Sequence, residues 1–373
     1  MRIDYKFVTF FASLVILNVV GMEKELTQNE EKAYSVNDLE NPIQFYKNGT
    51  VGLSDLKLTS LEGIEKLEYA APGYQRVIEW VFASQNMLAD ISVLTKLRNL
   101  SRIFISNNFI KELPNLSSMT SLHELTINAN QIKSLMNEGN EFLLPSSLEC
   151  LCINNNELDS IPDSFAVLTN LTFLAARNNN ITTITTFLAA LKKLNMVFLS
   201  YNKLPELPDT ITEIGISTSI FANQYDFSHN LLNKLPENIG DISKNQRAFL
   251  FLQSNKLKQI PISIGNLHNL SRLDLSNNDL NRLPDEIGNC TELRILTLNN
   301  NKLDKLPESI TKLINLQDLQ IMDNPNLQTK VSKMLYTFLC ALDAKGALHC
   351  GNPIAKQPAI PTEIRRTIYE YVS

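Results

Sequence analysis

The cysteines and histidines are the residues of this chain that could serve as nucleophiles or hold a metal ion. Cys150 and Cys152 stand two residues apart, and in a strand this spacing places both side chains on one face. A structural zinc site needs four such ligands, and no second pair of cysteines or histidines stands at a matching spacing. We therefore expect no metal ion here, and interpret the pair as two small thiols on a strand surface.

The remaining chemistry-bearing residues form no recognisable catalytic arrangement. The four histidines are not spaced to activate a nucleophile or to bind a metal; they are His123, His229, His268 and His349. The sequence contains no phosphate-binding P-loop, no GxGxxG turn and no GxSxG elbow. We expect a protein that is not an enzyme, with no cofactor and no small-molecule substrate.

The charge balance argues against nucleic acid as a partner. The 373 residues carry a formal net charge of −5, and the sequence pI is about 5.6. A protein that binds the phosphate backbone usually presents a basic patch or stripe, and a mildly acidic chain gives no electrostatic reason to expect one. We expect no nucleic-acid partner.

The first residues resemble an export signal. Arg2 and Lys6 precede an uncharged run from Phe7 to Val20, and Gly21 provides a small residue at a cleavage position. The sequence thus predicts a signal peptide over residues 1–21, a polar N-terminal segment or cap over 22–49, and a secreted or extracytoplasmic protein. No later segment is long and apolar enough to span a membrane. Alternatively, residues 7–20 pack as a cap on a cytoplasmic protein.

The elements that position these residues follow from a repeat with the pattern L-x-x-L-x-L-x-x-N-x-L. Leu270, Leu273, Leu275, Asn278 and Leu280 fill the pattern completely. An asparagine-free unit with Leu53 in the first position precedes the others. The asparagines at position 9 recur every 22 to 28 residues, at Asn86, Asn108, Asn130, Asn156, Asn179, Asn202, Asn230, Asn255, Asn278, Asn301 and Asn324.

The residue types of the repeat have a physical reason. Positions 3 to 5 predict one short strand per repeat, and the leucines at positions 1, 4, 6 and 11 predict a continuous core that only stacked neighbours can bury. Each asparagine amide carries a donor and an acceptor, so it can satisfy backbone groups where the chain leaves the strand. The sequence therefore predicts a ladder of structural asparagines.

The second half of the repeat indicates its class. The phrase Leu283-Pro284-Asp285-Glu286-Ile287-Gly288 is followed 23 residues later by Leu306-Pro307-Glu308-Ser309-Ile310. The chain is similar to leucine-rich-repeat proteins, and the phrase resembles the 23-residue repeats of Ras-suppressor-like proteins and of plant intracellular Ras-group proteins. The resemblance implies an α/β leucine-rich-repeat solenoid of about twelve repeats over residues 50–328. It also implies a curved horseshoe, with a parallel β-sheet on the concave face and short helices or irregular turns on the convex face.

The C-terminal region, residues 329–373, reads as a helical cap. The stretch VSKMLYTFLCAL, residues 331–342, is amphipathic, and the last repeat of a solenoid needs a cover. The final stretch IPTEIRRTIYEYVS resembles both the opening helix of an F-box and a further repeat phrase. The F-box resemblance leaves open an intracellular ubiquitin-ligase adaptor.

Positions 3, 5 and 7 of each repeat should point out of the core, because side chains alternate along a strand. Large aromatic and arginine side chains at these positions are typical of the core of a protein interface. We expect the concave face to bind a protein partner through aromatic residues, with Arg102, Arg177 and Asp226 setting its polarity. The expected contact residues are Trp80, Phe82, Arg102, Phe104, Phe173, Arg177, Met196, Phe198, Asp226, Phe249 and Phe251.

The sequence thus favours an exported, non-catalytic protein-protein interaction module. The alternative is an intracellular signalling scaffold or an F-box-like ubiquitin-ligase adaptor.

Overall fold

The computed structural model describes residues 35–39, 42–68, 77–215, 222–243, 246–327 and 332–349. The expected signal peptide and the final IPTEIRRTIYEYVS stretch lie outside the described residues.

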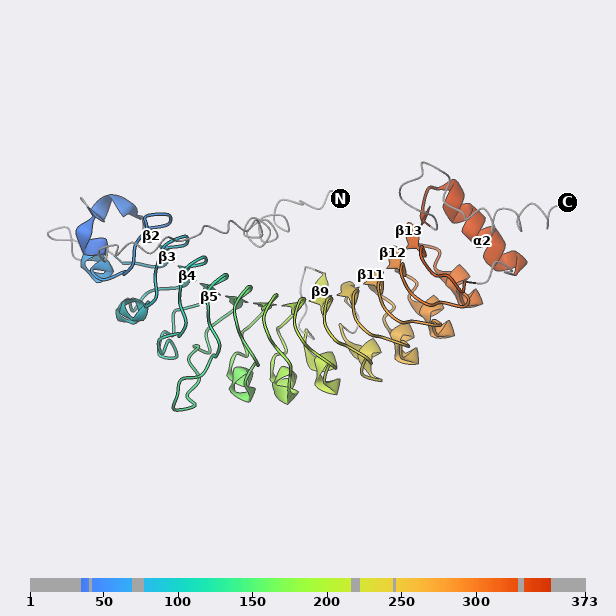
Figure 1. Cartoon of the computed structure of the whole chain (residues 1–373), viewed down its shortest axis with the longest axis horizontal. Coiled ribbons are helices and arrows are strands. Elements are labelled where there is room, and N and C mark those ends of the chain that lie inside the picture. Colours follow the sequence, from blue (N-terminus) through green and yellow to red (C-terminus); the bar gives the residue numbers. More distant parts are fainter. Residues whose placement is uncertain are drawn as a thin grey trace. The chain divides into compact units, whose positions relative to one another are not determined.

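The described residues form one sheet of 14 strands that lie side by side in chain order (Figure 1). The first pair, β1 and β2, is antiparallel, and every later pair is parallel. The strands are β1 (Tyr46–Lys47), β2 (Thr50–Gly52), β3 (Trp80–Phe82), β4 (Arg102–Phe104), β5 (Glu124–Thr126), β6 (Cys150–Cys152), β7 (Phe173–Ala175), β8 (Met196–Phe198), β9 (Asn223–Asp226), β10 (Ala248–Phe251), β11 (Leu270–Asp274), β12 (Ile295–Thr297), β13 (Asp318–Gln320) and β14 (Leu348–His349).

Short 3₁₀ helices return the chain on the other side of the core. Pro261, Pro284 and Pro307 each precede one of these helices with φ between −59° and −70°, the angle that the proline ring imposes. The helices are η1 (Val36–Asp38), η2 (Pro42–Phe45), η3 (Ile64–Glu68), η4 (Ser92–Lys96), η5 (Asp163–Val167), η6 (Thr186–Ala190), η7 (Asp209–Glu213), η8 (Ile239–Asp241), η9 (Ile262–Asn266), η10 (Asp285–Asn289) and η11 (Glu308–Lys312).

The glycine of the LPxxIG phrase allows successive 3₁₀ helices to approach closely. A Cβ atom on Gly265 would lie 2.6 Å from the backbone oxygen of Glu286 in the next repeat. No side chain fits in that space, which explains why glycine follows isoleucine in several of these phrases.

The leucines of the pattern form the core, as predicted. Leu270 is 1% exposed, and Leu273, Leu275 and Leu280 are completely buried. Burying one leucine contributes about 1.5–3 kcal/mol, and each of these side chains is covered by the repeats on either side of it. The predicted leucine-rich-repeat solenoid, with its parallel sheet on the concave face, is confirmed.

The position-9 asparagines connect neighbouring repeats through buried hydrogen bonds. Asn278 Oδ1 accepts the backbone N–H of Leu257 at 3.1 Å, and its Nδ2 donates to the carbonyl of Leu252 at 3.0 Å, both in the preceding repeat. Nδ2 also donates to the carbonyl of Leu275 at 3.1 Å in its own repeat. All eleven asparagines are between 4% and 9% exposed. Each of them therefore hydrogen-bonds the backbone of its own repeat and of the preceding repeat, at the point where the strands end.

The residue before each ladder asparagine adopts a left-handed backbone, which the sequence analysis did not anticipate. The turn off the strand requires positive φ there, and asparagine is among the few residues with a side chain that tolerate it. The positions are Gln85, Asn107, Ala129, Asn155, Asn178, Tyr201, His229, Ser254, Asn277, Asn300 and Asp323, with φ between 51° and 59°.

The first repeat has a different register from the one that the sequence suggested. Leu53 lies directly after strand β2, where it occupies position 6 instead of position 1, because Gly52 pairs with Phe82. Leu56 then stands at the ladder position, and its backbone N–H donates to Asn86 Oδ1 at 3.1 Å. Leucine spacing alone misled the assignment, since leucine recurs at several offsets within one repeat.

Non-repeat elements adjoin both ends of the described array. At the C-terminal end, helix α2 (Lys333–Ala344) buries Leu335, Leu339 and Leu342. Its N-cap is Ser332, whose hydroxyl accepts the backbone N–H of Leu335 at 3.1 Å. Strand β14 then extends the sheet beside β13. Among the described residues, no helix has the length and hydropathy needed to cross a membrane.

The substitution Asn278→Ala should destabilise the protein by about 1–3 kcal/mol or more, because it leaves buried backbone groups without partners. The measurement is the urea midpoint followed by circular dichroism. The exposed Asn281, three residues away, is the control, and Asn281→Ala should shift the midpoint little. Equal shifts for the two variants would contradict the structural role of the ladder.

Candidate protein-binding surface

Three clusters of aromatic and arginine side chains lie on the concave face of the sheet. The first spans β3 and β4, where Trp80 pairs in register with Arg102 and Phe82 with Phe104. The two phenylalanine rings stack with centroids 4.5 Å apart and planes 5° apart. The Arg102 guanidinium lies over the Trp80 ring at 4.6 Å, a cation–π arrangement. We call these four residues the N-terminal cluster.

Glu124 on β5 completes the N-terminal cluster electrostatically. Its Oε2 lies 3.5 Å from Arg102 Nε. Burial raises the pKa of the Glu124 carboxyl, and the nearby Arg102 charge offsets part of that rise. Glu124 is thus held beside the cation that stacks on the tryptophan.

The middle cluster centres on Phe198 of β8. The Arg177 guanidinium lies over the Phe198 ring at 4.4 Å, and the Phe173 ring of the neighbouring strand β7 lies 5.4 Å from the Phe198 ring. Arg177 Nη2 donates to Asp226 Oδ2 at 2.9 Å, while Asp226 Oδ1 accepts the Ser228 hydroxyl at 2.6 Å. Arg177 therefore bridges an aromatic ring and a fixed carboxylate.

The C-terminal cluster spans β10 and β11. Arg247 lies over the Phe249 ring at 5.4 Å, and Arg272 lies over the Phe251 ring at 5.0 Å. Arg272 also approaches Asp274 at 3.9 Å. This cluster repeats the combination of ring, guanidinium and carboxylate found in the other two.

The structure places the expected contact residues on the face predicted for them, but with two differences in exposure. Phe173 is 9% exposed and Asp226 is 8% exposed, so both are buried instead of available. Phe173 is covered because it packs against Phe198, and Asp226 because Arg177 and Ser228 enclose it. Trp80, Phe82, Phe104, Met196, Phe198, Phe249 and Phe251 are half-buried, and Arg102 is exposed.

Three of the four arginines in the clusters have a carboxylate beside them. The pairs are Arg102–Glu124, Arg177–Asp226 and Arg272–Asp274, whereas Arg247 Nη2 donates to the neutral Ser271 hydroxyl at 3.2 Å. A partner that approaches this face meets aromatic rings and cations that are mostly neutralised.

Sequence reasoning missed a stacked aromatic pair that follows strands β8 and β9. Tyr201 and His229 precede the ladder asparagines of neighbouring repeats, and their rings stack at 4.0 Å with planes 7° apart. Tyr201 is 55% exposed. Both residues hold a left-handed backbone, which is unfavourable for bulky side chains. The residue type could have revealed this pair, because most of the other residues that precede a ladder asparagine have small or amide side chains.

Two of the cysteine thiols, Cys150 and Cys290, have raised pKa values. A hydrogen bond with Cys152 and burial both raise the pKa of the Cys150 thiol, and burial raises the pKa of Cys290 to about 12. Protonated thiols are poor nucleophiles and poor metal ligands. Within the part of the chain that the structure describes, no group of three or more histidine, cysteine, aspartate or glutamate residues could hold a metal ion.

Comparison with known proteins agrees with this architecture. The Leucine Rich Repeat family matches residues 269–290 and 292–313. The chain is 34% identical over 132 residues to the adenylate cyclase of Schizosaccharomyces pombe, a match that covers 35% of this chain and 6% of the cyclase. The chain therefore spans only a small part of this relative.

Two solved structures show the same fold. The functional domain of InlJ from Listeria monocytogenes superposes with a TM-score of 0.60 and 20% identity, covering 76% of this chain and 55% of that one. The Arabidopsis receptor kinase HAESA, in complex with the peptide hormone IDA and the co-receptor SERK1, superposes with a TM-score of 0.55 and 24% identity. The match covers 73% of this chain and 46% of that one. The chain is a leucine-rich-repeat protein.

The substitution Tyr201→Asn should leave the free energy of unfolding within about 1 kcal/mol of the parent value. Asparagine relieves the left-handed strain, while the lost ring stacking costs about 0.5–1.5 kcal/mol. At the neighbouring repeats, Asn178 Nδ2 already donates to Asn155 Oδ1 at 2.8 Å, so the backbone accepts this residue. Urea unfolding provides the measurement. A loss as large as that of a ladder asparagine would show that Tyr201 is part of the core structure.

Proposed function

We propose that this protein is an exported, non-catalytic leucine-rich-repeat module that binds a protein partner on its concave face. The observation that carries the proposal is the set of three aromatic–arginine clusters on one rigid sheet. Aromatic and arginine residues dominate the energetics of protein interfaces. The clusters are already assembled through stacking and ion pairing, so binding costs little side-chain ordering.

The mostly paired charges of the clusters favour a partner surface that is itself apolar or neutral. Three of the four arginines already have a carboxylate, so a strongly acidic or basic partner gains little from long-range attraction. Burial of aromatic surface then supplies most of the affinity. The exposed Tyr201 ring extends this contact surface beyond the strands.

The relatives support a binding role more than a catalytic one. HAESA is a receptor kinase seen with a peptide hormone and a co-receptor. The similarity to adenylate cyclase covers 6% of that enzyme and therefore gives no support for cyclase activity in this chain. We propose that the partner is a protein or peptide.

Export rests on the N-terminal pattern, in which a 14-residue uncharged run follows two cations. N-terminal sequencing of the protein from its native source tests this part of the proposal. A mature chain that begins at Met22 supports export, whereas an intact Met1 would favour the intracellular scaffold or ubiquitin-ligase adaptor. Capture of ubiquitin-ligase core subunits by the purified chain would favour the adaptor specifically.

The double substitution Phe104→Ala and Phe198→Ala should weaken binding of the partner by at least about 30-fold. It removes one ring from each of two clusters, and a central interface residue contributes about 2 kcal/mol or more. The partner is first isolated by affinity capture from the native source, and its affinity is then measured by calorimetry.

The control is Phe109→Ala, which removes an aromatic ring that is 37% exposed and follows the ladder position Asn108. This variant should bind normally. Raising the salt from 50 to 500 mM should change the affinity of the parent protein by only a few-fold, because three of the four cluster arginines are already paired with carboxylates. An unchanged affinity for the double variant would reject the concave face as the binding site.

A further inference from the structure

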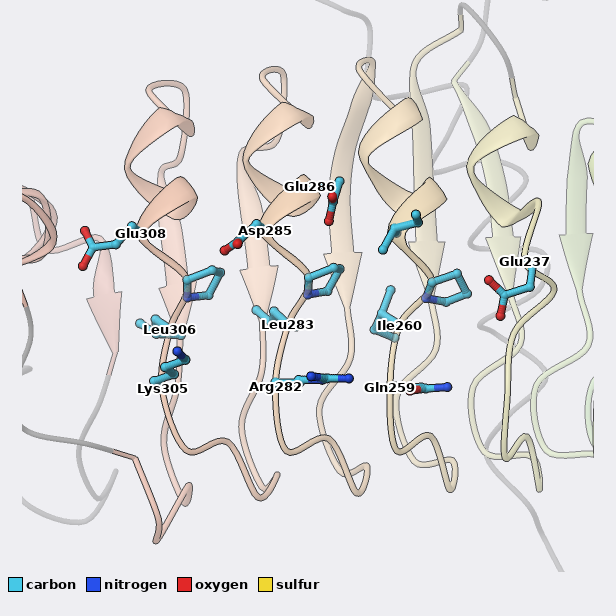
Figure 2. A pocket seen from close by; sticks show the side chains of 14 residues that line it. Glu237, Gln259, Ile260, Arg282, Leu283, Asp285, Glu286, Lys305, Leu306 and Glu308 are labelled. Carbon is cyan, nitrogen blue, oxygen red and sulfur yellow. The ribbon is translucent and has the colours of Figure 1, made fainter.

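A groove runs across the repeats on the opposite side of the core from the concave face. One cavity of about 690 Å³ spans the LPxxI phrases that contain Pro261, Pro284 and Pro307 (Figure 2). A second cavity of about 460 Å³ spans the phrases that contain Pro208 and Pro236. The two share Glu237, Gln259 and Pro261 in their walls, so they form one groove along the row of prolines.

Charges of opposite sign line the two sides of this groove. The residue after each proline is usually acidic, and these side chains are Asp209, Glu237, Asp285 and Glu308. The residue two positions before the proline is cationic in three repeats, as Lys234, Arg282 and Lys305, and is the acidic Glu206 in the first repeat of the groove. Figure 2 shows Arg282 and Lys305 on one side of the prolines, with Asp285 and Glu308 on the other. We call these the acidic row and the basic row.

Most of these charges have no partner within the chain. Among the described residues, Arg282, Lys305, Glu237 and Asp285 form no ion pair and no side-chain hydrogen bond. All four are exposed. These four charges therefore remain available to another molecule, whereas Lys234 Nζ pairs with Glu206 Oε2 at 3.0 Å and Glu308 Oε2 accepts the Ser332 hydroxyl at 2.6 Å.

The repeat at the centre of the groove breaks both rows. In the acidic row its residue is Ile262, which is 66% exposed, and in the basic row it is Gln259. An isoleucine so exposed between acidic residues is unfavourable in a free surface and favourable in a covered one. The groove thus has an uncharged centre flanked by charged repeats, the arrangement of an interface with a polar rim.

We propose that this groove is the contact surface of a homodimer. The charges recur once per repeat, so a partner must present opposite charges at the same spacing over several repeats. A second copy of this chain meets that requirement in the three repeats that carry both an acidic and a basic residue, because its own rows have the same spacing, but not at the first repeat, which carries Glu206 and Asp209. This inference concerns the groove alone and is independent of partner binding on the concave face.

The signs of the rows determine the symmetry of the dimer. A two-fold axis along the groove exchanges its two sides and places the acidic row of each copy opposite the basic row of the other. Glu237 then faces Lys234 of the second copy, and Asp285 faces its Arg282. A two-fold axis across the groove would instead place acid opposite acid. The two copies must therefore lie with their repeats in the same direction.

Charge reversal in the two repeats that flank Ile262 tests this proposal. The basic-row variant carries Lys234→Glu and Arg282→Glu, and the acidic-row variant carries Glu237→Lys and Asp285→Lys. In sedimentation equilibrium at low salt, the parent chain should form a dimer, whereas each variant alone should dissociate at least ten-fold more readily. An equimolar mixture of the two variants should restore the dimer, because each acidic surface then meets a basic one.

Two single variants complete the experiment. Ile262→Asp should weaken the dimer at least ten-fold, whereas Ile314→Asp, at a side chain that is 79% exposed and outside the groove, should not. A parent chain that is monomeric at all concentrations, or a dimer that survives the charge reversals, would overturn the proposal. A monomer whose groove binds a synthetic peptide of alternating Lys and Glu would assign the groove to a foreign partner and would equally overturn it.

Discussion

The structure depends on one buried interaction, the hydrogen bonds of the position-9 asparagine with the preceding repeat. Leucine side chains supply most of the burial energy, but they are interchangeable along the array and set no register. The amide of Asn278 fixes the register, because Oδ1 accepts from Leu257 while Nδ2 donates to Leu252. Since each ladder asparagine connects to the repeat before it, the parallel strands pair in register apart from one irregularity between Ala248 and Phe249, and the side chains at positions 3 and 5 form continuous rows.

That alignment creates the candidate binding surface. Phe82 stacks on Phe104 only because β3 and β4 are in register, and Arg177 reaches both Phe198 and Asp226 from the end of its own strand. The same alignment on the opposite side of the core produces the acidic and basic rows of the groove. One repeated constraint thus yields two surfaces of different character, an aromatic one on which most arginines are paired with carboxylates and a polar one on which most charges are unpaired.

Most of the fold could be predicted because the repeat couples local spacing to three-dimensional position. Asparagine is a stronger marker than leucine in this respect. The one repeat that was assigned the wrong register begins near Leu53 and contains no asparagine. Its leucines fitted the repeat pattern equally well in several registers. The sequence also contains a sign of the positive φ before each ladder residue, since amide residues such as Asn155 and Asn277 often stand there. This sign can be interpreted only once the turn is known.

The candidate site was harder to predict, because a repeat pattern gives the face of a side chain but not its neighbours. The alternation along β7 and β9 placed Phe173 and Asp226 correctly, yet Phe198 and Arg177 cover them. Tyr201 escaped notice since it follows the strand, outside the positions that alternation assigns to the sheet surface. Exposure depends on contacts between repeats, and these require coordinates.

Hydroxyl-radical footprinting of the complex tests the central claim most directly, because it reports the solvent access of individual side chains without altering them. With the isolated partner bound, oxidation of Trp80, Phe104, Phe198 and Tyr201 should fall several-fold, while that of Phe109 should stay unchanged. Protection confined to other side chains, with these four oxidised as in the free protein, would show that the partner binds elsewhere.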